Sequence, residues 1–242
     1  MSFLTPRHWL RWLIGSVIVL AVLAAAGPFI YIHFFNGSTP AALSLSPAST
    51  GASTSASTPA ASTAAAGGSV AGTWTVGSGS VVGYRVNEVL LGQSATAVGR
   101  STSVSGRLVL TGTTVTAADF SVPMDTIHSD KSQRDAQFDG RIMDVAAYPT
   151  GTFTLTAPIS LAPLPAGGVI KSYTAHGNLT LHGTTRAVTF TLTAERKGAQ
   201  IEVAGHIPVV FADYNIANPS FAGFVTTQNY GQLEFLLVLH KV

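Results

Sequence analysis

Residues 173–194 read YTAHGNLTLHGTTRAVTFTLTA, and this stretch decides the fold class. Over residues 173–181, apolar or small side chains alternate with Thr, His and Asn, and over residues 188–194 apolar side chains alternate with threonines. A period of two places alternate side chains on opposite faces of a β-strand. Gly183 lies between the two runs, so the stretch predicts a β-hairpin with one apolar and one polar face.

The same alternation recurs on both sides of this hairpin. It is clear in residues 152–157 and 201–207, and shorter runs suggest strands at 82–86, 106–110, 120–124 and 233–239. Turn glycines separate them, at Gly112, Gly167, Gly168 and Gly198. Sheets with one wet face are typically antiparallel, and a barrel of about eight strands can just hold a small ligand. We therefore expect a mainly β fold, an eight-stranded antiparallel lipocalin-like β-barrel.

One charged segment interrupts the strands. Residues 129–143 read SDKSQRDAQFDGRIM and are densely charged compared with the predicted strands. The Ser132 to Asp135 spacing matches a capping box, and Ala136, Phe138 and Ile142 form a short apolar stripe. This pattern predicts a helix over residues 131–139 that ends near Gly140 and caps the mouth of the barrel.

The N-terminus predicts a membrane anchor. Residues 1–11 contain Arg7 and Arg11, and residues 12–35 are almost unbroken apolar sequence. As a helix these residues would span about 36 Å, enough for a hydrocarbon core of about 30 Å. By the positive-inside rule the N-terminus is cytoplasmic and the rest is extracytoplasmic. The alternative is a signal peptide cleaved near Ala26.

Residues 36–72 are rich in Ser, Thr, Ala, Pro and Gly. Such a composition offers little to bury, so we expect a disordered linker that holds the domain on the order of 30 Å from the membrane. The domain organisation predicted is a cytoplasmic N-terminus (1–11), an anchor (12–35), a linker (36–72) and a β-barrel domain (73–242).

Charge and cysteine content exclude several functions. Only Arg7 and Arg11 among the 13 Lys and Arg precede Arg85, so residues 85–242 contain 13 − 2 = 11 basic residues. They also contain all 11 acidic residues and are formally neutral. A neutral domain is a poor candidate for nucleic-acid binding, which needs phosphate neutralisation.

The chain has no cysteine, which excludes disulfides and thiolate metal sites. His176 and His182 are six strand positions apart, about 20 Å, too far to share one metal ion.

Two motifs resemble the YceI-like family of polyisoprenoid-binding, lipocalin-like bacterial envelope proteins. The first combines Arg134-Asp135, residues 142–145 (IMDV), Tyr148-Pro149-Thr150 and Phe153. The second is residues 177–188, GNLTLHGTTRAV. The similarity covers about residues 73–242. It implies an extended barrel closed by a helix, with an apolar tunnel for an isoprenoid chain such as a quinone.

The resemblance and the inward strand faces together give the candidate ligand-binding residues. The apolar candidates are Phe120, Val122, Met124, Phe138, Ile142, Met143, Phe153, Leu155, Leu179, Leu181, Phe190, Leu192, Tyr214 and Phe235. Arg134 is the head-group candidate, and a structural ion pair or helix cap is the other interpretation of Arg134 and Asp135. We expect no catalytic residues, no metal and no cofactor other than a bound polyisoprenoid or quinone.

The sequence therefore predicts a non-enzymatic protein that binds, stores or transports a long apolar lipid at the outer side of the cytoplasmic membrane. Two alternatives stay open: a lipid-modifying enzyme on a barrel scaffold, and a ligand-free surface or adhesion module with a filled core. A homodimer is an alternative to a monomer.

Overall fold

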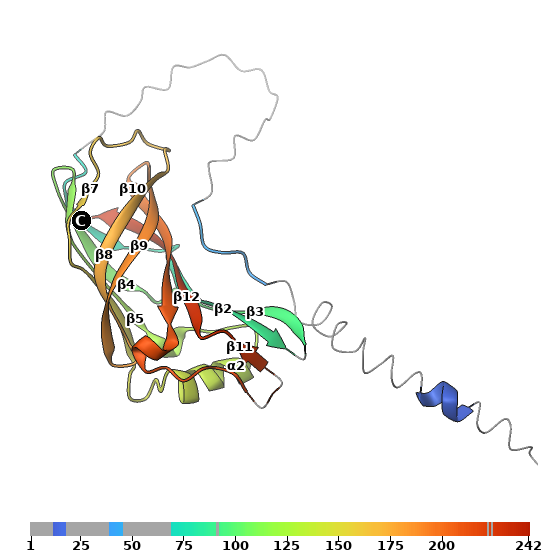
Figure 1. Cartoon of the computed structure of the whole chain (residues 1–242). Coiled ribbons are helices and arrows are strands. Elements are labelled where there is room, and N and C mark those ends of the chain that lie inside the picture. Colours follow the sequence, from blue (N-terminus) through green and yellow to red (C-terminus); the bar gives the residue numbers. More distant parts are fainter. Residues whose placement is uncertain (1–11, 18–38, 46–68, 91, 222, 224) are drawn as a thin grey trace, which may run out of the picture.

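The computed structural model describes residues 12–17, 39–45 and 69–242, except residues 91, 222 and 224. Residues 69–242 form a single twelve-stranded sheet that curls into a barrel (Figure 1). Its strands are β1 (Gly72–Val76), β2 (Val81–Leu90), β3 (Gln93–Ser101), β4 (Ser105–Thr111), β5 (Thr114–Pro123), β6 (Thr150–Leu155), β7 (Ile159–Ser160), β8 (Lys171–Leu181), β9 (Thr184–Lys197), β10 (Gln200–Val210), β11 (Val225–Thr227) and β12 (Tyr230–Lys241).

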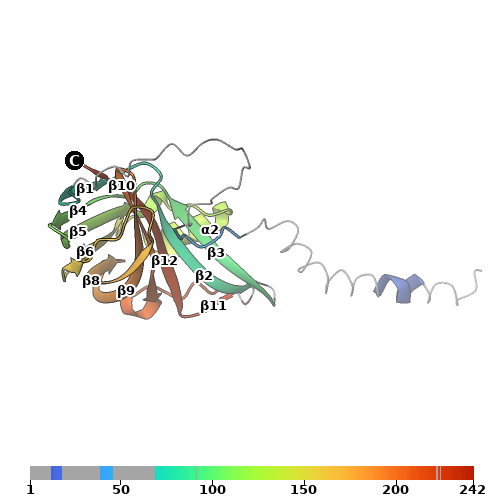
Figure 2. The ribbon, with the colours of Figure 1, turned by 90° about the horizontal axis from the view of Figure 1, so that it is seen from above.

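Eight of these strands close the barrel. The hydrogen-bonded order is β1, β4, β5, β6, β8, β9, β10 and β12, and β12 pairs again with β1 through Trp74↔Lys241 and Val76↔Leu239. Every pairing is antiparallel, and several of these strands follow one another around the barrel in Figure 2. The expected mainly β class and closed eight-stranded antiparallel barrel are therefore confirmed.

The remaining four strands extend this ring. β2 pairs with β12 next to β1, β3 and β11 pair with β2, and β7 pairs with β5. At one end, therefore, the β2–β3 hairpin projects beyond the ring, and β11 lies against it. Strands β1, β3, β7 and β11 were not predicted, because the eight predicted runs correspond to β2, β4, β5, β6, β8, β9, β10 and β12. β3 consists mainly of small and polar residues (QSATAVGRS), which carry little of the periodicity that marked the other strands.

The alternation predicted for residues 173–194 matches the observed burial. In β8, Ala175, Leu179 and Leu181 are buried, while Thr174, His176 and Asn178 are exposed. Gly177 also faces inward, and a Cβ atom there would lie 2.3 Å from the Phe153 ring. The glycine therefore leaves room for an aromatic side chain from the neighbouring strand β6.

Two clusters of buried side chains divide the barrel interior along its length. One surrounds Trp74 and Leu239, which are 4% and 0% exposed, and the Trp74 indole donates a hydrogen bond to the Val70 carbonyl at 2.9 Å. The other includes Phe138 and Met143 of the helical segment. We call these two ends of the barrel the Trp74 end and the helix end.

The helical segment differs in detail from the expectation. It is an α-helix, α2 (Ser132–Gln137), followed by a π-helical turn, η3 (Phe138–Ile142), so it passes through Gly140. The capping-box prediction was wrong: Lys131 is the N-cap residue, and it makes no side-chain cap hydrogen bond. Asp135 instead accepts hydrogen bonds from the Ser129 amide at 2.8 Å and the Ser129 hydroxyl at 2.6 Å. Two short 3₁₀-helices, η2 (Met124–Thr126) and η4 (Phe211–Tyr214), follow β5 and β10.

The predicted N-terminal anchor lies largely outside the described residues, of which only 12–17, in helical conformation, belong to it. In the part of the chain that the structure describes, no helix is long and apolar enough to cross a bilayer. Two parts of the predicted linker are described: residues 39–45 and residues 69–72. Both make contacts with the barrel, which a plain spacer would not do.

Candidate functional site

The barrel encloses a cavity of about 660 Å³. Its wall includes Val115, Leu237 and Leu239 at the Trp74 end, all nine-tenths or more buried. At the helix end the wall includes the exposed side chains of Gln133, Arg141 and Phe221. The cavity therefore runs along the barrel axis and reaches the surface at the helix end.

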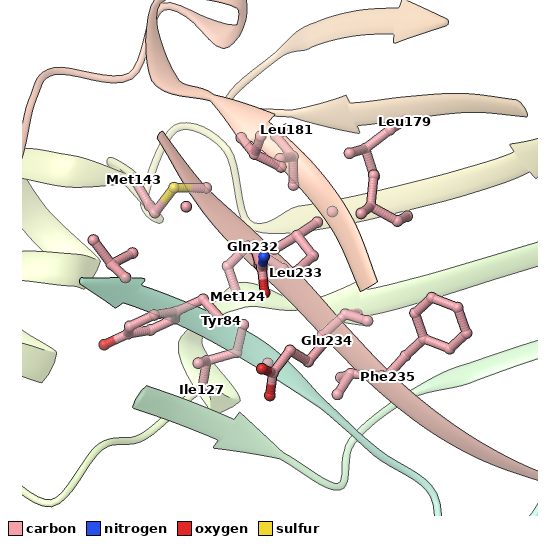
Figure 3. A pocket seen from close by; sticks show the side chains of 18 of the residues that line it. Tyr84, Met124, Ile127, Met143, Leu179, Leu181, Gln232, Leu233, Glu234 and Phe235 are labelled. Atoms are coloured by element: carbon pink, nitrogen blue, oxygen red, sulfur yellow. The ribbon is translucent and has the colours of Figure 1, made fainter. Parts of the chain in front are cut away.

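Most of the predicted site residues line this cavity. Thirteen of the apolar candidates belong to its wall: Phe120, Val122, Met124, Phe138, Ile142, Met143, Phe153, Leu155, Leu179, Leu181, Phe190, Leu192 and Phe235. They come from five strands and from the segments on either side of α2, and Figure 3 shows several of them around one space. Their contact with a ligand stays a prediction.

Tyr214 does not line the cavity. β10 ends at Val210, and the chain turns there into η4, where Tyr214 is 2% exposed and packs within the cluster of the helix end. Its hydroxyl has no hydrogen-bond partner among the described residues. Strand alternation could not have placed this side chain, because a 3₁₀-helix replaces the strand.

The sequence analysis missed other lining residues, although β2, β10 and β12 carry the same alternation. These residues are Tyr84, Val86, Ile207, Val209, Leu233, Leu237 and Leu239. Extending the period-two reading along each strand would have found them. Phe211, Ile216 and Phe221 lie outside strands or helices longer than four residues, and no periodic signal marks them.

The polar side chains of the wall gather at the helix end. They include Glu88 near the tip of β2 and, from the helical segment, Lys131, Gln133, Arg134, Gln137 and Arg141. The Trp74 end contributes apolar side chains such as Leu108, Val115 and Leu239. The cavity is thus amphipathic along its axis, with a polar opening and an apolar far end.

Tyr84 lies at the boundary between these two parts. Its ring stacks on Phe138, with 5.1 Å between ring centroids and 15° between planes. Burial raises the pKa of Tyr84 well above its ordinary value of 10.0, and the nearby Arg134 charge offsets only part of this effect. The hydroxyl therefore stays protonated and can donate a hydrogen bond to a polar group in the opening.

Arg134 is held beside Tyr84 by two carboxylates. One guanidinium nitrogen donates to Asp130 at 2.5 Å, and the other lies 3.4 Å from Glu88. The Arg134 side chain is 20% exposed and contributes to the cavity wall. Five N–H donors leave capacity for a further acceptor, so the structural and the head-group interpretations of Arg134 are compatible.

A buried ion cluster lies at the cavity wall, and Glu234 is its member among the lining residues. Glu234 lies between Leu233 and Phe235 on β12 and is only 3% exposed. It accepts hydrogen bonds from Arg85, at 2.5 Å, and from Arg100. Burial alone would raise the pKa of Glu234, but the two arginines outweigh it, so the pKa lies below the ordinary value of 4.5.

The two histidines that suggested a metal pair have separate partners. The exposed His176 is 2.9 Å from the Thr189 hydroxyl, whereas His182 lies against the Tyr148 ring with 4.4 Å between centroids. His182 adopts a left-handed conformation (φ 47°) next to Gly183 in the β8–β9 turn. Among the described residues, no group of three or more His, Asp or Glu is placed to hold a metal ion.

Comparisons with known proteins agree with this geometry. The profile of the YceI-like domain matches residues 74–239. A polyisoprenoid-binding domain from Saccharophagus degradans, implicated in plant cell wall breakdown, is similar in structure with a TM-score of 0.57 and 16% identity. The match covers 70% of this chain and 98% of that one. BcnA of Burkholderia cenocepacia has a TM-score of 0.50 and 22% identity, with 64% and 95% of the two chains covered.

At these sequence identities, the two structural similarities show a shared fold. A comparison with functionally curated protein sequences gave no match.

Proposed function

The chain belongs to the YceI-like family, and from this premise we propose that it binds a long apolar lipid, a polyisoprenoid or isoprenoid quinone, inside its barrel. The observation that carries the proposal is the axial cavity of about 660 Å³, apolar at the Trp74 end and open and polar at the helix end. The similarity in fold to the polyisoprenoid-binding domain from Saccharophagus degradans supports it.

Burial of the hydrocarbon chain supplies the affinity in this proposal. Each CH₂ group moved from water into the cavity contributes about 0.8 kcal/mol. The side chains around the middle of the cavity, such as Phe153, Leu179 and Phe190, give such a chain apolar contacts on all sides. No charged contact along the chain is needed, and the described inner wall of the Trp74 end offers none.

The polar end of the lipid would lie at the helix end. There Tyr84 offers a hydroxyl donor and Arg134 a guanidinium, both beside the opening. A quinone carbonyl or a hydroxyl head group could accept hydrogen bonds from both. The tail would then extend toward Leu237 and Leu239.

We place the protein at the outer side of the cytoplasmic membrane, anchored by residues 12–35. The apolar length of this segment and the preceding Arg7 and Arg11 support this topology. Such a binding protein would store or transport lipid taken from the adjacent bilayer.

Lipid extraction and native mass spectrometry of the full-length protein, purified from membranes, test the proposal. The wild-type protein should yield a stoichiometric isoprenoid lipid. Leu155→Trp, which fills the cavity, should lose it, and Thr154→Trp, on the exposed face of the same strand, should keep it. A wild-type protein without apolar lipid would favour the ligand-free surface module, and recovery of chemically altered lipid would favour the enzyme.

A further inference from the structure

Residues 39–45 of the predicted linker lie in extended form against the barrel, and we call this segment the strap. In Figure 1 it is drawn in blue beside β2 and β3. Two hydrogen bonds hold it: the Pro40 carbonyl accepts from Arg85 at 2.7 Å, and the Leu43 amide lies 3.5 Å from Glu234 Oε2. Both partners belong to the buried ion cluster.

The ion cluster is built so that this contact can form. Glu234 of β12 is opposite Gly83 of β2, and Gly83 is opposite Arg100 of β3. Because Gly83 has no side chain, Glu234 and Arg100 meet across the intervening strand. A Cβ atom at Gly83 would lie 1.9 Å from the Gly99 carbonyl oxygen. Glu234 thus binds two arginines and still presents Oε2 to the strap.

Apolar contacts accompany the hydrogen bonds. Leu45 is 8% exposed and Leu43 is half-buried, whereas Ala41, Ala42 and Ser44 are exposed. Within residues 36–69, Leu43 and Leu45 are the only side chains larger than threonine and proline apart from Asn36. The two leucines of this otherwise small and polar segment are therefore the ones that pack.

The strap has a defined direction on the barrel. Its Pro40 is at Arg85, and its Leu43 is at Glu234, which pairs with Gly83. The strap therefore runs opposite to β2, whose C-terminal end at Leu90 belongs to the helix end. The N-terminal end of the strap, at Thr39 and Pro40, therefore lies on the side of the cavity opening.

The next described residues after the strap, Ser69 and Val70, lie at the opposite end of the barrel, the Trp74 end. Val70 is buried beside Trp74, and the Ser69 carbonyl accepts a hydrogen bond from Lys241 at 2.8 Å. If the strap were not docked, the barrel would be attached to the membrane anchor only at its Trp74 end, through the whole of residues 36–68. With the strap docked, at most about 18 Å of extended chain separates the end of the predicted anchor, at Phe35, from Pro40 at the barrel.

The rim of the opening suits a lipid surface. Val89 and Phe221 are 42% and 54% exposed at the helix end, and Arg141 lies 6.0 Å from the Phe221 ring centroid. Lys131 and Arg141 are cations on the adjacent helical segment. Exposed apolar side chains beside cations can enter the headgroup region of a bilayer and attract anionic lipids.

We infer that the strap turns the cavity opening toward the bilayer, so that Val89 and Phe221 at the rim contact the lipid surface from which the ligand enters. This inference rests on the proposed membrane anchor and lipid binding. With the strap docked, the linker sets the orientation of the barrel relative to the membrane as well as its distance from the membrane.

Strap docking is measured first, on the full-length protein. The chain has no cysteine, so Ser44→Cys on the strap and Ser94→Cys on β3 give one spin-label pair. A narrow distance distribution is expected, and Leu43→Pro, which removes the amide donor, should broaden it. Ala41→Pro, at an exposed strap position, is the matched control and should leave it narrow. A broad distribution in the parent pair overturns the inference.

Orientation is then measured in lipid nanodiscs with one fluorescent label at a time. A label at Val89→Cys, at the rim, should be quenched several-fold more by spin-labelled lipids than one at Thr113→Cys, in the β4–β5 turn at the Trp74 end. Leu43→Pro should reduce this difference, and Ala41→Pro should preserve it. Equal quenching at both sites, or no effect of Leu43→Pro, contradicts the inference.

Bound lipid, extracted from the same preparations, separates the two proposals. Retained lipid with equal quenching would overturn the orientation inference and leave lipid binding intact. Quenching at Val89 without any bound lipid would overturn lipid binding and leave orientation intact.

Discussion

The Trp74 end and the helix end of the same barrel are built differently. At the Trp74 end, Trp74, Leu110 and Leu239 are almost fully buried and the eight-stranded ring is closed by β1 and β12. At the helix end, β2 and β3 project from the ring, and polar side chains surround the opening. The Trp74 end is thus built as a closed apolar core, and the helix end is the open, polar end at which the proposed ligand would enter.

The largest expected difference between the ends is in stability. Trp74→Ala removes a buried indole and its hydrogen bond to Val70, and should lower the free energy of unfolding by about 3–5 kcal/mol. Urea unfolding measures this change. Leu164→Ala, at an exposed position, is the control and should have little effect. A loss from Trp74→Ala as small as that of the control would refute the assigned role of the Trp74 end.

The ion cluster should show the next largest effect. Glu234→Gln leaves Arg85 and Arg100 without their shared carboxylate, and should cost about 1–3 kcal/mol of unfolding free energy at neutral pH. Glu202→Gln is the control, because Glu202 pairs with Lys197, which is 57% exposed.

The pH dependence gives this prediction a second measurement. Since the pKa of folded Glu234 is below its ordinary value of 4.5, its contribution is present above that value. The contribution is lost as the pH falls through the lower, folded-state pKa. Glu234→Gln should therefore flatten the acid limb of unfolding free energy against pH below pH 4.5. An unchanged acid limb would mean that other carboxylates dominate.

A smaller effect is expected at the helix end. Phe138→Leu removes the ring that stacks on Tyr84, and should lower the unfolding free energy by about 1 kcal/mol. Because Phe138 also lines the cavity near its opening, bound lipid should dissociate faster. Stopped-flow transfer of a fluorescent isoprenoid to vesicles measures the rate, with Ala136→Ser on the exposed face of α2 as control. Unchanged release would show that the helical segment does not limit exit.

The smallest effect should come from Arg134. Arg134→Gln should weaken binding of an isoprenoid with a carbonyl or hydroxyl head by about 1 kcal/mol, while a headless hydrocarbon of equal length binds unchanged. Competition with a fluorescent isoprenoid measures both affinities. Arg186→Gln, whose guanidinium binds the Asp213 carbonyl away from the cavity, should alter neither. Equal weakening of both ligands would assign Arg134 to structure alone.

The sequence was most informative where one strand face is buried. Residues 173–194 alternate because β8 and β9 have an apolar cavity on one side and water on the other. Nine of the thirteen predicted apolar residues that line the cavity lie on strands, and they line it for this reason. β3 escaped prediction because small residues such as Ala97 and Gly99 weaken the periodic signal. Gly99 is required there, since the Tyr84 and Ile127 side chains occupy the space that a Cβ atom would need.

The strap could not be predicted from composition, because its residues resemble a spacer. Docking depends on Glu234, which is distant in sequence and becomes available only after β2, β3 and β12 have paired. The sequence does contain one signal, the pair Leu43 and Leu45 in a segment otherwise poor in large side chains. The polar opening is likewise a product of tertiary structure, since Glu88 and Arg134 approach across 46 residues.

In the proposed function, a long lipid lies along the barrel axis with its head at the helix end and its tail at the Trp74 end. An isoprenoid with a photoreactive diazirine at the tail end, cross-linked within the full-length protein and mapped by peptide mass spectrometry, tests this claim most directly. We expect adducts at the Trp74 end, on Leu237, Leu239 or Val115. Tail adducts confined to Tyr84, Phe138 or Phe221 at the helix end would contradict it.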